Sequence, residues 1–211
     1  ELIGTSLREH VDEIVLHAVA DLLPFVEPGA AAQRVMTGNI GPTGALCDVT
    51  VHLQQDLVHL EIEPLPPGRP SPGAAMNAQV MISRVAGIAD AGEFFNRVAE
   101  QVHELTGYDR VMIYRFRHDD AGEVIAEAVA DGVESYLGLR YPGSDIPAQA
   151  RRLYLVNRLR VIPDITYTPV PIQPPVVGGE AMDLGQHVLR SVSPVHLEYL
   201  RNMGIAASMS I

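Results

Sequence analysis

The chain has 211 residues, of which 47% are hydrophobic and 19% charged, a balance typical of a globular protein and not of a disordered one. Its 15 basic and 26 acidic residues give a net charge of −11, which argues against nucleic acid or an anionic membrane as partner because both select positive surfaces. One cysteine, Cys47, excludes an internal disulfide framework and favours a reducing compartment. No apolar run approaches the roughly 20 residues of a membrane helix. We therefore expect a cytoplasmic protein with no membrane partner.

We expect no targeting signal at the start of the chain. It opens at Glu1, without an initiator methionine and without the basic and apolar regions of a signal peptide. We expect it to be a fragment of something longer.

The first 63 residues combine a helical pattern with a hairpin pattern. Ser6 and Glu9 form a capping-box pattern, and apolar residues at helical spacing follow as far as Leu23. From Leu46 the apolar period changes to two, on both sides of the short segment 54–56. This pattern predicts a helix over 6–23 and an antiparallel hairpin with one face in water, ending at Pro64.

A proline-rich stretch follows the hairpin. Residues 64–72 contain five prolines, which favours an extended, semi-rigid linker. We predict a first domain over 1–63, a linker over 64–72 and a second domain over 73–211.

The second part of the chain alternates helical and strand patterns. Helices are predicted over 74–85, from Asp90 to Gly107, from Pro147 to about 157, and from Pro194 to Gly204. Strands are predicted near 111–115, 124–129 and 160–162, and over 206–211, where the last strand is cut off by the end of the chain. Residues 166–179 are predicted to be a loop. The order indicates an α+β domain built on an antiparallel sheet.

Common catalytic and metal-binding motifs do not occur in the sequence. None of the eight histidines lies in an HExxH pattern, and one cysteine cannot form a CxxC pair, so we predict no metal ligands and no structural zinc. There is also no GK[ST] phosphate loop, no GxGxxG after a strand, no GxSxG elbow and no locally organised Ser/His/Asp set. The chain is predicted not to be an enzyme, with an acyl hydrolase as the remote alternative.

Two segments stand out because prolines and glycines fix the backbone beside a polar residue. The first, YPGSDIPAQAR, holds Asp145 just before a helix, where Asp145 or Ser144 could simply cap that helix. The second, LRSVSPVHLEYL, presents His196 near a helix N-terminus, where the helix dipole disfavours the imidazolium. On the residues alone, a satisfied core histidine is the more common role for a residue in the position of His196.

Longer runs around both segments resemble the bacterial phytochrome family. The run YPGSDIPAQARRLY resembles the signature of the phytochrome GAF domain, and LRSVSPVHLEYLRNMG resembles a second signature of that family. Between the preceding helix and these runs, LTGYDRVMIYRF and GEVIAEA resemble the family's strand pair. The ELIG start and the hairpin ending in EIEP resemble the later part of a phytochrome PAS domain. The resemblance implies a partial PAS domain followed by a GAF domain, each an antiparallel sheet flanked by helices.

The resemblance also implies a set of residues around a linear tetrapyrrole, biliverdin IXα. Asp145 matches the family residue whose main-chain carbonyl faces the pyrrole N–H groups, and His196 matches the histidine beside the central pyrroles. Arg160 and Arg190 match arginines that bind one propionate, a carboxylate suited to a planar guanidinium fork. The remaining cofactor-binding residues implied are Ile146, Pro147, Tyr114, Tyr141, Tyr154, Ser193, Ser208 and Ser210.

The chain departs from the family at two positions that bear on the pigment. Gly143 stands where the motif commonly has alanine, which we expect to loosen the backbone before Asp145. Val195 stands where plant and cyanobacterial members carry their attachment cysteine. Biliverdin-binding members use instead a cysteine upstream of the PAS domain, so we expect the covalent link upstream of residue 1. Cys47, on the predicted PAS hairpin, is predicted to be a structural thiol.

The resemblance therefore implies a red/far-red photoreceptor module that relays photoisomerisation to an output domain outside this chain. It implies a homodimer, a downstream output domain or response regulator as partners, and a sensor histidine kinase as the parent protein. The alternative is a GAF/PAS module without pigment, used for dimerisation or for sensing another small ligand.

Overall fold

The computed structural model describes residues 3–40, 44–65, 74–177 and 179–211. The chain divides into two compact units, which we describe separately: unit 1 comprises Glu1–Pro67 with Arg151–Ile211, and unit 2 comprises Gly68–Ala150. The prolines at 66, 67, 70 and 72 of the predicted linker lie outside the described residues. The predicted domain boundaries at 63 and 73 stay a prediction.

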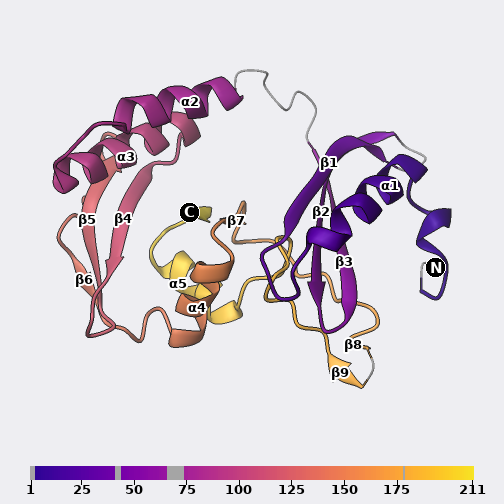
Figure 1. Cartoon of the computed structure of the whole chain (residues 1–211). Helices are drawn as coiled ribbons and strands as arrows, with labels where there is room; N and C mark the ends of the chain where they lie inside the picture. The colour runs from indigo at the N-terminus through magenta and orange to yellow at the C-terminus, as the bar shows by residue number, and fades with distance from the viewer. Residues whose placement is uncertain (1–2, 41–43, 66–73, 178) are drawn as a thin grey trace. The chain divides into compact units, whose positions relative to one another are not determined.

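The first part of unit 1 is a three-stranded antiparallel sheet beside a helix (Figure 1). Strands β1 (Gln33–Ile40), β2 (Ala45–Gln54) and β3 (Leu57–Pro64) pair in the order β1-β2-β3, and helix α1 (Glu13–Leu22) contacts β1. The predicted hairpin is confirmed, with a turn at Gln55 and Asp56, whose φ angles are 50° and 58°. The core between helix and sheet consists of the buried side chains of Val11, Val15, Val19, Val26, Ile40, Cys47, Val49 and Val51.

The predicted helix over 6–23 is wrong in its first half. Ser6 and Glu9 do form the capping box, but they cap only a 3-10 turn, η1 (Leu7–Glu9). The helix proper starts after a new N-cap, Asp12, and a second 3-10 turn, η2 (Leu23–Phe25), follows it. Val11 lies between the two caps and is buried in the same core as Val15 and Val19, so the apolar helical spacing continues across the break in the helix.

The polar face of the β2–β3 hairpin is not in water, contrary to the sequence prediction. His52, His59 and Glu61 are 0%, 7% and 9% exposed. The segment Asp183–Leu189 covers them: the Val188 and Leu189 amides donate to the Glu61 carboxylate at 2.9 and 2.8 Å. This long-range contact joins the hairpin to sequence more than 120 positions away, which period-two patterning alone cannot reveal.

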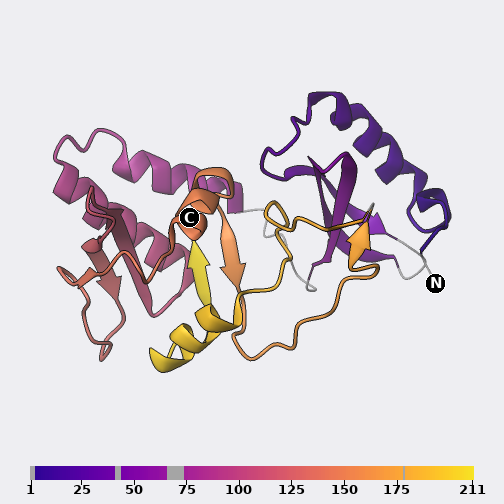
Figure 2. The same ribbon diagram turned by 90° about the horizontal axis from the view of Figure 1, so that it is seen from below.

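The later part of unit 1 contains a second small core. Strand β7 (Arg160–Ile162) pairs antiparallel with β10 (Ser208–Ser210), as the orange and yellow arrows of Figure 2 show. Helix α5 (Pro194–Asn202) lies between them in the sequence, and a short hairpin of β8 (Val176–Val177) and β9 (Glu180–Ala181) precedes it. The buried side chains here are Ile162, Ile165, Val192, Leu197 and Leu200.

Unit 2 is a helix-covered antiparallel sheet (Figure 1). Strands β4 (Arg110–Phe116), β5 (Gly122–Val129) and β6 (Arg140–Tyr141) pair in the order β4-β5-β6. Helix α3 (Ala91–Thr106) contacts β4 and β5, and α2 (Ala74–Val85) contacts α3. Asp90 caps α3 by accepting from the Glu93 amide at 2.8 Å, and Gly107 ends it at a φ of 70°. Helix α4 (Ala148–Val156) spans the division between the units.

The predicted α+β class with antiparallel sheets is confirmed. None of the helices in the described ranges combines the length and the apolar character of a bilayer-spanning segment.

Candidate functional site

In unit 2 the predicted aromatic residues lie at one end of the sheet. The ring centroids of Tyr114 and Tyr141 are 6.1 Å apart, and those of Tyr114 and Phe116 are 5.3 Å apart in an edge-to-face arrangement. Burial raises the pKa of Tyr141, and the neighbouring Tyr136 acts in the same direction. Tyr141 therefore stays a neutral phenol, able to donate a hydrogen bond at neutral pH.

Gly122 is the residue that lets Tyr114 occupy this position. A Cβ atom built at Gly122 would lie 1.7 Å from the Tyr114 hydroxyl oxygen. No side chain can be added there without displacing the ring. No pattern in the sequence indicates this role of Gly122.

Asp145 lies in a short turn just before α4. Its backbone amide donates to the Pro142 carbonyl at 3.1 Å, and the Ser144 hydroxyl donates to its carboxylate at 3.5 Å. The Asp145 side chain is exposed within unit 2, Ile146 is half-buried, and α4 begins one residue after Pro147. Proline and this turn bond hold the backbone around Asp145, as the sequence indicates.

Gly143, in the same turn, is constrained by a close neighbour. A Cβ atom at this position would lie 2.9 Å from both the Cβ and the carbonyl oxygen of Asp120. The alanine common in the family would require the Asp120 turn to move. Gly143 therefore permits this close approach, and a looser backbone before Asp145 stays a prediction.

In unit 1, His196 lies in the first turn of α5. Burial lowers its pKa, and the nearby Arg160 guanidinium lowers it further. Its ring is stacked with the Tyr199 ring, and the two ring centroids are 6.3 Å apart. Ser193 is the N-cap residue and Pro194 follows it, but the exposed Ser193 side chain makes no capping hydrogen bond. His196 is thus a neutral imidazole at neutral pH, with acceptor capacity.

The two predicted arginines of unit 1 lie close enough to influence each other. Burial lowers the pKa of Arg190, with a further contribution from Arg160. Arg190 donates to the carbonyls of Gly185 and His187 at 3.2 and 2.9 Å. Arg160 has no ion-pair partner in the described ranges.

The predicted hydroxyl residues share the Arg160 strand pair. Ser210 is the register partner of Arg160, and Ser208 is that of Ile162. In an antiparallel ladder, side chains of directly paired residues, and of residues two positions apart on one strand, point to the same face. The two serines and Arg160 therefore lie on the same face. Tyr154, on α4, lies near enough to Arg190 to affect its pKa. The structure thus gathers cations and hydroxyls suited to an anion.

The charged network of unit 2 was missed from the sequence. Glu127 is buried, accepts from the backbone amides of Tyr136 and Leu137 at 2.9 and 3.2 Å, and lies 3.5 Å from Arg110. The Arg110 guanidinium stacks over the Tyr136 ring at 3.3 Å. The alternation of β5 indicates that Glu127 shares a face with Glu123, but its loop partners are not visible in any local pattern.

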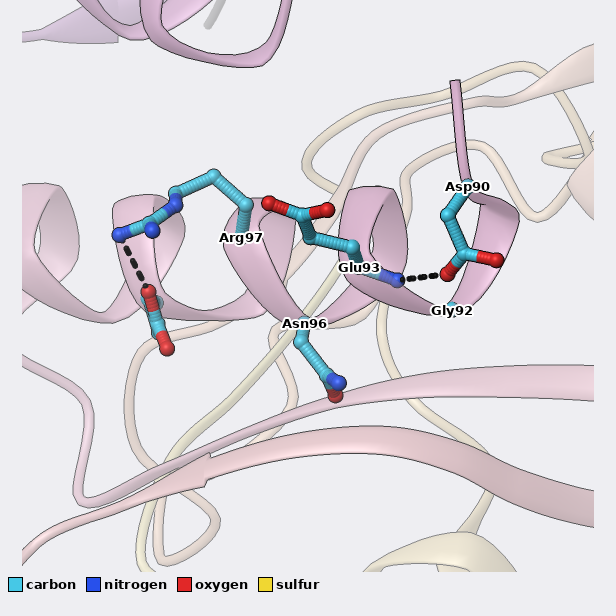
Figure 3. A pocket seen from close by; sticks show the side chains of 6 residues that line it. Asp90, Gly92, Glu93, Asn96 and Arg97 are labelled. Carbon is cyan, nitrogen blue, oxygen red and sulfur yellow. Dashed lines mark hydrogen bonds and ion pairs between the residues drawn. The ribbon is translucent and has the colours of Figure 1, made fainter. Parts of the chain in front are cut away.

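Two surface depressions of unit 2 do not contain the predicted site residues. One, of about 390 Å³, is lined by Asp90, Gly92, Glu93, Asn96, Arg97 and Glu100 on the outer face of α3 (Figure 3). Its lining residues are all exposed, Arg97 donates to Glu100 at 2.9 Å and Asp90 caps the helix. The other, of about 430 Å³, lies beside Phe95, Arg115 and Glu123, and Arg115 donates to Glu123 at 2.8 Å. We interpret both as solvated surface.

Comparison with known proteins identifies the domain and the family. The profile of the family described as GAF domain matches residues 90–211. The chromophore binding domain of Stigmatella aurantiaca phytochrome P1 is 39% identical, with a TM-score of 0.81, over 99% of this chain and 69% of that one. The chromophore-binding domain of the bacteriophytochrome RpBphP3 from R. palustris is 34% identical, with a TM-score of 0.83, over 99% and 68%.

Full-length relatives give the same result. A bacteriophytochrome of Pseudomonas aeruginosa is 49% identical over 169 residues, which is 79% of this chain and 23% of the relative. The phytochrome-like protein Cph1 of Synechocystis is 38% identical over all of this chain and 29% of its own length. The chain therefore spans about a quarter of these relatives. With its GAF domain preceded by an antiparallel sheet, the chain belongs to the phytochrome family, as the chromophore-binding PAS–GAF region of a bacteriophytochrome.

Proposed function

We propose that this chain is a red/far-red light-sensing module that binds biliverdin IXα in its GAF domain. When bound, a bilin supplies visible-light absorption and a double bond that light isomerises. The response passes to an output domain outside the chain, and we propose a cytoplasmic homodimer signalling to a response regulator through a sensor histidine kinase. The observation that carries the proposal is the group of Arg160, Arg190 and the neutral His196 in unit 1.

The arginines and serines supply the chemistry that propionates need. Arg160 has no ion-pair partner in the described part of the chain, and Arg190 donates to the backbone carbonyls of Gly185 and His187. Two neighbouring guanidiniums repel each other unless an anion lies near both. A carboxylate relieves that repulsion and accepts charge-assisted hydrogen bonds, while Ser208 and Ser210 on the Arg160 ladder offer further donors.

His196 supplies an acceptor rather than a second positive charge. Its lowered pKa keeps the imidazole neutral at neutral pH. A neutral ring can accept a hydrogen bond from a cationic ligand without charge repulsion. Unit 2 offers two further polar groups. The main chain around Asp145, which the turn holds in place, can accept a hydrogen bond, and the neutral Tyr141 phenol can donate one.

The covalent link is proposed to form outside these 211 residues. Cys47 is the one cysteine of the sequence, is 4% exposed and packs in the core between α1 and the sheet. A buried thiol in an apolar core is unreactive. Biliverdin added to this chain should therefore separate from it on a denaturing gel; a pigmented band would contradict this part of the proposal.

The propionate role can be tested by titrating the chain with biliverdin and, separately, with biliverdin dimethyl ester. We expect the free acid to bind more tightly, because only the acid carries carboxylates. Arg160→Gln should weaken binding of the acid by roughly tenfold or more, the value of one charge-assisted hydrogen bond, and leave ester binding unchanged. Arg158→Gln, at an exposed arginine two residues away, is the matched control.

The outcomes separate two parts of the proposal. Absence of binding by either compound would overturn the pigment function and favour a module without pigment. Equal binding of acid and ester, unchanged in Arg160→Gln, would leave the pigment but overturn the role given to the arginines.

A further inference from the structure

A cluster of histidines lies on the covered face of the β2–β3 hairpin, apart from the residues assigned to the pigment. His52 and His59 are register partners on neighbouring strands, and His187 comes from the segment that covers them. One ring nitrogen from each of these residues lies within 4.8 Å of the other two. The His52 and His59 rings are stacked with centroids 4.7 Å apart, and His187 meets both rings edge-on at 4.5 and 4.7 Å.

The cluster contains buried nitrogen atoms that the protein itself does not satisfy. His52 is 0% exposed. Neither of its ring nitrogens has a hydrogen-bond partner among the described residues, and the same holds for Nδ1 of His187. Burial of an imidazole with no hydrogen bond is unfavourable. A metal ion bound to the unprotonated ring nitrogen of His52 would reduce that cost.

One ligand of the cluster is already oriented. His59 Nε2 lies 3.3 Å from the Gln54 carbonyl oxygen. Because a carbonyl only accepts, this bond places the proton on Nε2 and leaves the lone pair of Nδ1 facing His187 Nε2 at 3.1 Å. Tetrahedral coordination at about 2.0–2.1 Å brings imidazole nitrogens to roughly 3.4 Å from one another. The His59–His187 pair is near that separation, and the His52 ring must turn toward them.

The surroundings also suit a cation. One Glu61 carboxylate oxygen lies 4.0 Å from His52 Nδ1 and accepts from the Val188 amide, while the other accepts from the Leu189 amide, so the carboxylate contributes negative charge beside the ligands.

We propose that His52, His59 and His187 form a binding site for a divalent late transition metal, of which Zn²⁺ is the probe. Imidazole is a preferred ligand of this class of ion. Bound metal would cross-link the β2–β3 hairpin to the segment around His187 and so stabilise unit 1. The absence of local zinc motifs does not bear on this site, since its ligands are brought together only by the fold.

The test is a Zn²⁺ titration of the full 211-residue chain without pigment, because tetrapyrrole nitrogens bind zinc themselves. We expect one equivalent of bound Zn²⁺ and a rise in the unfolding temperature that a chelator reverses. His187→Gln should lose this equivalent, whereas His118→Gln, at an exposed histidine of unit 2, should retain it.

If the His187→Gln variant does not fold, an experiment on the wild-type protein alone still tests the proposal. X-ray absorption of the zinc-loaded wild type should show a shell of imidazole ligands, three per ion. No stoichiometric binding, a shell without imidazole, or a folded His187→Gln variant that binds zinc as the wild type does would each overturn the site. None of these results depends on whether the chain binds biliverdin.

Discussion

At the scale of single residues, the charge state of His196 decides whether its ring can accept a hydrogen bond from the proposed pigment. Burial and Arg160 lower its pKa below the ordinary 6.5. An NMR titration of the His196 ring should therefore give a midpoint below 6.5. Arg160→Gln removes the second cause and should move the midpoint upward, whereas Arg158→Gln should leave it unchanged. A wild-type midpoint at or above 6.5 would contradict the environment described for this ring.

Gly122 gives a second prediction for a single residue. Since its Cβ would meet the Tyr114 hydroxyl at 1.7 Å, Gly122→Ala should lower the free energy of unfolding by about 1–3 kcal/mol, the usual cost of overpacking. Urea denaturation measures this.

The matching control is a double-mutant cycle with Tyr114→Ala. If the clash with the ring is the cause, the alanine at 122 costs less once the ring is absent, and the two changes are not additive. Strict additivity would show that Gly122 acts through something other than Tyr114.

Candidate site residues could be proposed from the sequence where a local motif carries them, and their roles at the pigment stay predictions. Asp145 and His196 each lie in a proline-bordered segment that indicates its own backbone. Gly122 and Glu127 could not be found this way, because their importance arises from Tyr114 and from the loop at Tyr136, which no short pattern connects to them.

At the scale of elements, the β4–β5 hairpin carries a pH-sensitive ion cluster. Glu123 accepts from Arg115 at 2.8 Å and from Arg117 at 2.7 Å. These bonds lower the pKa of Glu123 from 4.5 to about 2. A carboxyl whose pKa is lower when folded contributes stability that is complete above pH 4.5 and is lost as the pH falls toward 2.

We therefore expect Glu123→Gln to be less stable than the wild type at neutral pH and to lose less stability on acidification through that window. Chemical denaturation at several pH values measures both. Glu134→Gln, at an exposed glutamate of the same unit, is the control. Parallel pH profiles for Glu123→Gln and the wild type would contradict the assignment.

Most helices and strands could be predicted to within a residue or two from period and caps. The hairpins β2–β3 and β4–β5 and strand β7 are examples. Strand β1 was missed because a β-bulge between Arg34 and Met36 interrupts its period-two pattern. The helix over 6–23 was predicted too long because the capping box of Ser6 and Glu9 indicates where a helical turn can start but not how far it continues.

At the scale of the whole molecule, Glu61 joins distant parts of unit 1. Its two carboxylate oxygens accept from the amides of Val188 and Leu189. Glu61→Gln replaces one acceptor oxygen by a donor and should leave a buried amide unpaired, at a cost of about 1–3 kcal/mol of unfolding free energy. Glu63→Gln, at an exposed residue two positions along β3, should change stability by less than about 0.5 kcal/mol.

Equal stabilities of these two variants in urea denaturation would show that the 183–189 segment is not anchored through Glu61. This anchoring also explains why the sequence pattern predicted that one face of the hairpin lies in water. Polar and apolar residues do alternate along β2 and β3, but the partners of the polar side chains come from elsewhere in the chain. Fold class and family could be predicted from the sequence, whereas the histidine cluster required the tertiary structure.

Biliverdin binding is the central property proposed for this chain, and an absorption spectrum tests that binding most directly. The purified chain is mixed with biliverdin, freed of unbound pigment, and measured before and after red illumination. We predict a band shifted to longer wavelength than that of free biliverdin, and a change on illumination that reverses in the dark or under far-red light. A spectrum equal to the sum of free pigment and protein, unchanged by light, would contradict the photoreceptor function.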